Sequence, residues 1–153
     1  MKFNLKIFEG TDSVKFGMTS QEIQSILKIT PALFKKSEVD LYDTEDYQRT
    51  CHVTYEDDGS GILRCAAFEF FKNSEVYLNN IQLLGKQREE IEELFKNTFD
   101  DCEIDIGGIR SCSSELFLYA PILPHEKIIQ SVFISRKGYY EKSKAFYEKH
   151  FPV

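Results

Sequence analysis

Residues 14–27 read VKFGMTSQEIQSIL and residues 82–95 read QLLGKQREEIEELF, and the two stretches match at one constant offset. The matched pairs are Phe16 with Leu84, Gly17 with Gly85, Glu22 with Glu90, Ile23 with Ile91, Ile26 with Leu94, and Leu27 with Phe95. In both stretches an apolar residue and a glycine lead into a polar turn and then an amphipathic segment, which is typical of a strand–turn–helix. This repetition predicts a duplicated α+β unit, and it indicates an architecture rather than a reaction.

Helix signals are clear in both stretches. Thr19 and Glu22 form the pattern of a capping box, in which a hydroxyl and a carboxylate satisfy the first free amides of a helix. The second helix is expected over residues 89–99. The predicted inward-facing residues are Ile23, Ile26 and Leu27 in the first helix, and Ile91, Leu94, Phe95 and Phe99 in the second.

Strands are expected where apolar and polar residues alternate between Gly-, Asp- and Ser-rich turns. The expected strands cover the first residues of the chain and then 47–56, 62–71, 75–78, 102–106, 113–119 and 128–136, and Gly107-Gly108 is expected to end the strand at 102–106. The turn DDGSG at 57–61 predicts a hairpin. Residues 35–46 are polar and acidic, so they are predicted to form an irregular loop, and residues 139–150 are predicted to form a closing helix that docks through Tyr140, Phe146 and Tyr147.

These elements predict an α+β fold made of two related helix-plus-antiparallel-meander units that share one core, with a C-terminal helix. We expect a single domain over residues 1–153, with unit one at about 1–78, unit two at about 79–136 and the helix at about 139–150. No linker or change in composition separates the units, and 153 residues are enough to bury a substantial core.

The turn Phe16-Gly17-Met18-Thr19 followed by Glu22-Ile23, and its weaker counterpart Leu84-Gly85 with Glu90-Ile91, resembles the repeat unit of the β-lactamase-inhibitor-protein and BamE-like group. This resemblance implies a helical segment before antiparallel strands, and tandem units that present a curved sheet to a protein partner. In size and charge the chain is also similar to cytosolic immunity proteins of bacterial toxin systems.

The bulk composition excludes several classes of protein. A formal charge of −6 and a pI near 5.1 argue against nucleic-acid binding, which requires a basic face. No apolar run reaches the length of a membrane span, and residues 1–10 alternate like a strand rather than a signal peptide. We therefore expect a cytoplasmic protein with no membrane partner, whose cysteines (Cys51, Cys65, Cys102 and Cys112) are small buried hydrophobes more often than disulfides.

No catalytic set stands out. His52 is adjacent to Cys51, but neighbouring strand residues point to opposite faces, and His125 and His150 lie in a connection and near a terminus. The acids at 56–59 and 100–105 lack the spacing of a calcium loop. The sequence therefore predicts no catalytic residues, no metal and no cofactor.

One segment combines acids with aromatic residues, a composition that suits an interface with a basic protein. The predicted partner-binding residues are Asp40, Tyr42, Asp43, Glu45, Asp46 and Tyr47. We predict a non-enzymatic protein-binding module of the bacterial cytosol, of the immunity type that inhibits a basic toxin. The alternative is a small-molecule-binding module or divergent enzyme with a pocket between helix and sheet, with His52, Tyr55 and Arg64 as candidates. The sequence does not indicate an oligomeric state.

Overall fold

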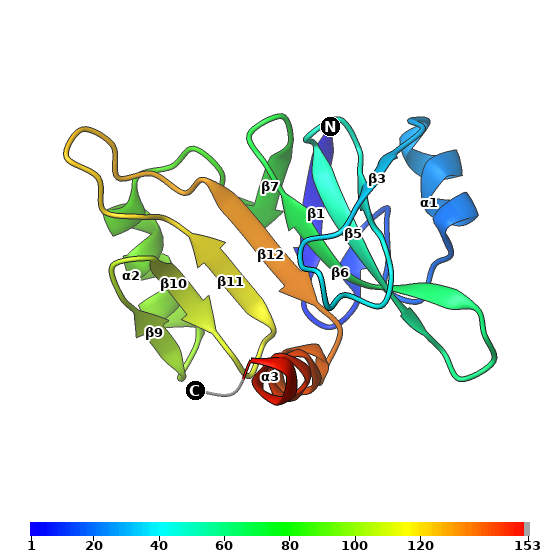
Figure 1. The fold of residues 1–153 in the computed structure, drawn as a ribbon. Helices are drawn as coiled ribbons and strands as arrows, with labels where there is room; N and C mark the ends of the chain where they lie inside the picture. The colour runs from blue at the N-terminus through cyan, green and yellow to red at the C-terminus, as the bar shows by residue number, and fades with distance from the viewer. Residues whose placement is uncertain (152–153) are drawn as a thin grey trace.

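The computed structural model describes residues 1–151 and has an α+β fold, with three helices and two sheets (Figure 1). The helices are α1 (Ser20–Leu27), α2 (Arg88–Thr98) and α3 (Tyr139–His150). The strands are β1 (Lys2–Lys6), β2 (Gly10–Thr11), β3 (Ala32–Phe34), β4 (Thr44–Asp46), β5 (Cys51–Asp57), β6 (Leu63–Phe70), β7 (Glu75–Leu78), β8 (Ile81–Gln82), β9 (Cys102–Ile104), β10 (Gly108–Ser111), β11 (Leu116–Tyr119) and β12 (Ser131–Ser135).

The large sheet has eight antiparallel strands in the order β3-β4-β5-β6-β12-β11-β10-β9. Its order is symmetric: β6 and β12 meet at the centre, and the strands that precede each of them in the chain follow outward to the two edges. The small sheet has the order β2-β1-β7-β8, and β1 and β7 are parallel neighbours. The two sheets thus each join strands from the first and second halves of the chain.

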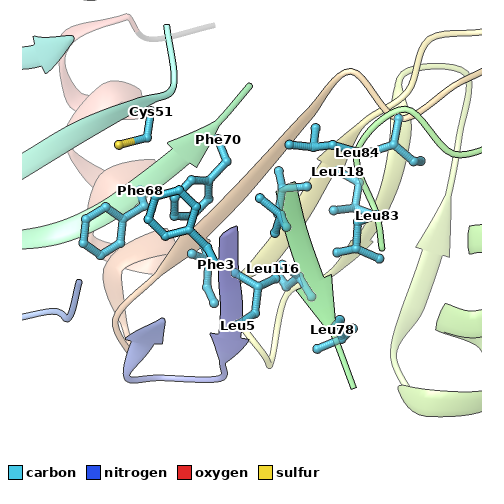
Figure 2. Packing of buried hydrophobic residues seen from close by; sticks show 14 of the residues in the cluster. Phe3, Leu5, Cys51, Phe68, Phe70, Leu78, Leu83, Leu84, Leu116 and Leu118 are labelled. Carbon is cyan, nitrogen blue, oxygen red and sulfur yellow. The ribbon is translucent and has the colours of Figure 1, made fainter. Parts of the chain in front are cut away.

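The core lies on one face of the large sheet, where α1, α2 and the small sheet cover it. Figure 1 shows α1 and α2 near opposite ends of this sheet. At the centre, the ring of Phe3 on β1 packs against Phe70 on β6 with centroids 4.7 Å apart, and Phe68 lies beside Phe70 (Figure 2). All three rings are buried, so the small sheet is fixed on the large one by hydrophobic contact.

The two helices predicted from the matched stretches are present as α1 and α2. The capping box of α1 is confirmed, because the Thr19 hydroxyl accepts the Glu22 amide hydrogen bond and the Glu22 carboxylate accepts that of Thr19. Ile23 and Leu27 are buried, as are their counterparts Ile91 and Phe95 in α2. The prediction for Ile26 is wrong: it is 40% exposed, because α1 ends after two turns and only its i, i+4 pair reaches the sheet.

Four strands, β2, β3, β4 and β10, were not predicted from the sequence, and two of them show why. Residues 44–46 form β4 rather than a loop, because pairing with β3 and β5 orders a short segment that has no apolar alternation. The predicted break after the strand at 102–106 is present, because β9 ends at Ile104, but residues 108–111 then form β10, which was not expected. A Cβ at Gly108 would lie 1.9 Å from the Leu118 carbonyl oxygen, so glycine permits the close strand approach here.

The predicted C-terminal helix is confirmed as α3, and it packs on the face of the large sheet that is opposite the core. Over the described residues 1–151, no helix has both the length and the apolar character needed to cross a lipid bilayer.

Candidate functional site

The face of the large sheet opposite the core carries a continuous row of side chains from one edge strand to the other. Strand register places them side by side in the order Ala32, Asp46, His52, Glu69, Phe133, Phe117, Arg110 and Glu103. Since side chains alternate between the two faces of a strand, this row points away from the core. We call this surface, made of the row and the side chains beside it, the open face.

Ion pairs hold the charged side chains of the row in fixed positions. The Glu69 carboxylate lies 3.1 Å from the Lys36 amine and accepts a hydrogen bond from the Ser131 hydroxyl at 3.2 Å. Arg110 pairs with Glu103 at 2.9 Å and with Asp105 at 2.6 Å. The hydrogen bond from Arg110 lowers the pKa of Asp105, and the same bond raises the pKa of Arg110. These half-exposed pairs orient the side chains more than they stabilise the fold.

Aromatic side chains occupy the centre of the row. Phe117 and Phe133 are half-buried and pack edge to face with centroids 6.1 Å apart, and the Lys36 amine lies 6.0 Å from the Phe133 ring. Beside them the Tyr119 side chain is 53% exposed. Aromatic groups flanked by arginine and ion pairs are a composition that protein interfaces favour.

Helix α3 covers one end of the open face. Tyr139 packs on Phe133, and Tyr140 packs on Phe117, with ring centroids 6.1 and 5.1 Å apart. The buried Glu115 carboxylate accepts the Gly138 and Tyr140 amide hydrogen bonds at 2.9 and 3.1 Å, so it acts as a remote N-cap of the helix. No residue of α3 is fully buried.

Three hollows lie along the open face. A groove of about 380 Å³ runs between α3 and the sheet, with Leu41 and Tyr42 on its border. A second hollow, of about 270 Å³, lies over Arg110, Phe117 and Tyr119. The largest, about 690 Å³, surrounds His52 at the end of the face away from α3.

The fold divides the predicted partner surface. Glu45 and Tyr47 were expected at the surface, but both are buried on the core face. The Glu45 carboxylate accepts hydrogen bonds from the hydroxyls of Tyr47 at 2.5 Å, of Tyr55 at 2.7 Å, and of Ser20 on α1. Because these contacts use Glu45 internally, neither Glu45 nor Tyr47 has a side chain to offer to a partner.

Of the other four predicted residues, Asp46 belongs to the row of the open face, and Asp40, Tyr42 and Asp43 lie at the surface beside it. Tyr42 is 36% exposed and borders the groove under α3. The acids are held by groups of this chain: Asp40 by the Tyr147 hydroxyl, Asp43 by Lys35 at 3.4 Å, and Asp46 by the Arg49 backbone amide at 2.8 Å. Of these contacts only the Lys35–Asp43 ion pair offsets a negative charge, so the segment stays acidic.

The structure does not gather the residues of the alternative prediction. Tyr55 points into the core, His52 points to the open face, and Arg64 pairs with Asp58 at 2.8 Å in the β5–β6 hairpin. His125 lies in the exposed connection before β12, and His150 lies near the end of α3. A pocket between helix and sheet does occur, at α3. Of the three residues of the alternative prediction, its lining includes Tyr55 but neither His52 nor Arg64.

The cysteines are all free thiols. Cys51 and Cys65 are buried, and burial raises the pKa of the Cys51 thiol to about 12. The prediction that cysteines serve as small buried hydrophobes is thus confirmed for these two.

Sequence reasoning missed the aromatic centre of the open face. Residues 116–119 read LFLY, which is apolar throughout, so periodicity could not show which side chains face outward. Only the register of β11 against β12 places Phe117 beside Phe133.

Comparison of the chain with known protein families, with curated proteins and with solved structures finds no match. The resemblance of the Gly17 and Gly85 turns to the β-lactamase-inhibitor-protein and BamE-like group therefore stays a prediction.

Proposed function

We propose that this chain is a non-enzymatic protein-binding module that uses the open face. The observation that carries the proposal is the unequal covering of the large sheet. One face is filled by α1, α2 and the small sheet, whereas the other carries aromatic side chains between ion pairs, where α3 packs on Phe117 and Phe133 and leaves Tyr119 exposed. A sheet face of this kind offers the mixed aromatic and charged surface on which protein interfaces are built.

We also propose that the fold consists of two related units. The hydrogen bonds at the two matched glycines support this. The Gly17 amide donates to the Cys65 carbonyl, and the next residue, Met18, accepts from the Cys65 amide. Gly85 and the next residue make the same two bonds to Ile129. With the symmetric strand order, this supports units that pair through β6 and β12, with α3 as an addition. The pairing of β7 with β1 favours a boundary before β7, a few residues earlier than the boundary at about residue 78 that the sequence predicts.

The narrower proposal is an immunity-type inhibitor in the cytosol with a basic protein partner. It rests on the net charge of −6, since an acidic protein attracts a basic one at long range. Within this proposal Asp46 contributes on the open face, and Asp40, Tyr42 and Asp43 contribute at its border.

The test is affinity capture with matched variants. Tagged wild-type protein is compared with Tyr119→Ala and Arg110→Ala, which alter the open face, and with Lys6→Ala and Ile81→Ala, which alter exposed residues of the small sheet. We expect a stoichiometric partner that the two open-face variants lose and the two control variants retain. Equal capture by all five proteins, or loss only in the small-sheet variants, would place binding elsewhere. Release of the partner at high salt checks the narrower proposal.

A further inference from the structure

The groove of about 380 Å³ between α3 and the sheet is the starting point, and we call it the α3 groove. Its volume is near the lower end of those found for ligand pockets, so it suits a single side chain rather than a whole segment of chain. Phe133 belongs both to its lining and to the row of the open face. The groove is therefore continuous with the surface on which a partner is proposed to dock.

Aromatic residues border the α3 groove on two sides. Phe133 lines it on the sheet, and Tyr139, Phe146 and Tyr147 line it on the helix. The ring centroids of Tyr139 and Phe133 are 6.1 Å apart, and the rings of Phe146 and Tyr147 stand at right angles with centroids 5.4 Å apart. The faces of such rings attract a cation, and the attraction grows as water is excluded.

Negative charge exceeds positive charge at the α3 groove. The charged residues of its lining are the acids Asp40, Glu56 and Asp57 and the bases Lys36 and Lys142. Both lysines are already paired with carboxylates, Lys36 with Glu69 at 3.1 Å and Lys142 with Glu56 at 3.4 Å. Arg136 also pairs with Glu56. When Glu69 and Arg136 are counted with the lining, four acids face three bases, and one negative charge is left over.

Asp40 is the carboxylate of the groove that can take a cation. It accepts hydrogen bonds from two neutral donors, the Tyr147 hydroxyl and the Ser37 backbone amide, the latter at 3.0 Å. It is half-buried and makes no ion pair within residues 1–151. Burial, and then the charges of Glu56 and Asp40, raise the pKa of Tyr139 to about 12, and Arg136 opposes them less strongly. The charges around this ring therefore act on it as net negative.

We propose that the α3 groove receives an arginine side chain of the protein partner. Its guanidinium lies against the rings of Tyr139 and Tyr147 and pairs with the Asp40 carboxylate. Arginine fits better than lysine, because a planar guanidinium can stack on a ring and bind a carboxylate at once. The inference rests on the proposed function, since the arginine belongs to the protein that docks on the open face.

Two probes of nearly the same shape test the proposal: Nα-acetyl-arginine amide, which is positive, and Nα-acetyl-citrulline amide, which is neutral. Each is titrated into protein with ¹³C-labelled tyrosine rings, and the ring signals are followed by NMR. We expect the arginine probe to shift the signals of Tyr139 and Tyr147, and not those of Tyr77 and Tyr119, which lie outside the lining. It should bind at least about fivefold more tightly than the citrulline probe.

The matched variants are Asp40→Asn and Glu90→Gln, which change the net charge equally. Asp40→Asn keeps an oxygen to accept from the Tyr147 hydroxyl, so its effect is that of the charge, and it should weaken binding of the arginine probe about threefold. Glu90 is an exposed residue of α2, which covers the other face of the sheet, so Glu90→Gln should bind like the wild type. Melting temperatures check that both variants keep the fold.

Equal affinity for the arginine and citrulline probes, shifts only at tyrosines outside the groove, or unchanged affinity in Asp40→Asn would each overturn the proposal. Choline, a compact free cation, is the third probe. If it shifts the same signals and binds more tightly than the arginine probe, the groove is a site for a free organic cation and the assignment to a partner's arginine is wrong. The titration needs no partner, so its failure overturns this inference alone, whereas failure of affinity capture overturns the proposed function.

Discussion

Replacement of Glu45 by alanine measures how much the buried carboxylate contributes to the fold. Its loss leaves the hydroxyls of Tyr47 and Tyr55 without an acceptor, and because these residues are 0% and 5% exposed, water cannot replace it freely. An unsatisfied buried donor costs about 1–3 kcal/mol. Two of them therefore cost about 4 kcal/mol, with the partly exposed Ser20 hydroxyl counted as zero. For a chain of this size the melting temperature should fall by about 8–16 °C.

The assay is urea unfolding of the wild type and three variants, followed by circular dichroism. Glu45→Gln keeps one carbonyl acceptor, so we expect about half of the alanine effect. Asp43→Ala removes an acid from the same segment, but the Lys35–Asp43 pair is nearly half exposed, and its loss should cost less than about 0.5 kcal/mol. If Glu45→Ala costs less than about 1 kcal/mol, or no more than Asp43→Ala, the reasoning that Glu45 anchors the core is refuted.

Three further predictions concern stability. Burial, and then Glu45, raises the pKa of Tyr47 and Tyr55 above the ordinary value of 10.0, so above pH 10 the unfolded state loses protons that the folded state keeps. The free energy of unfolding should therefore fall above pH 10 by about 1.4 kcal/mol per pH unit for each phenol, and the double phenylalanine variant should show a shallower fall in urea titrations. Arg88 is buried, donates to the carbonyls of Asp105 and Ala120, and pairs with Glu92 at 2.7 Å. Arg88→Lys should therefore lower the free energy of unfolding by about 3 kcal/mol in chemical unfolding, and a loss below about 1 kcal/mol would contradict this. Gly108→Ala should lower the free energy of unfolding by about 2 kcal/mol or more, which is several degrees in melting temperature. Gly107→Ala, whose Cβ would meet only the Asp105 carboxylate at 3.4 Å, should change it by less than about 1 kcal/mol. Similar melting temperatures for the two variants would be inconsistent with this account.

The sequence predicted what local chemistry determines. The capping box at Thr19 and Glu22, the buried pairs Ile23–Leu27 and Ile91–Phe95, and the hairpin at 57–61 all follow from patterns of a few residues, and the structure has them. The predicted α+β class is likewise present.

The sequence could not predict what depends on partners far away in the chain. The acids at positions 40–46 belong to one polar segment, and nothing local distinguishes Glu45 from the others. Glu45 nevertheless turns inward, because the hydroxyls of Tyr47, Tyr55 and Ser20 meet there. The same limit applies to the open face. Phe117 and Phe133 become neighbours through strand register, which local composition does not encode.

The meeting of β6 and β12 at the centre of the large sheet has a consequence for folding. Ala67 pairs with Ser135 there, and in the small sheet Lys2 pairs with Glu75. These two strand pairs, β6–β12 and β1–β7, are seams that join segments distant along the chain. Closing such long loops is entropically slow, so the seams should form after the local hairpins. Until the seams form, the free edge of β6 in one molecule can pair with the free edge of β12 in another. Refolding at high protein concentration should therefore produce dimers that have exchanged halves, with every native strand pair retained.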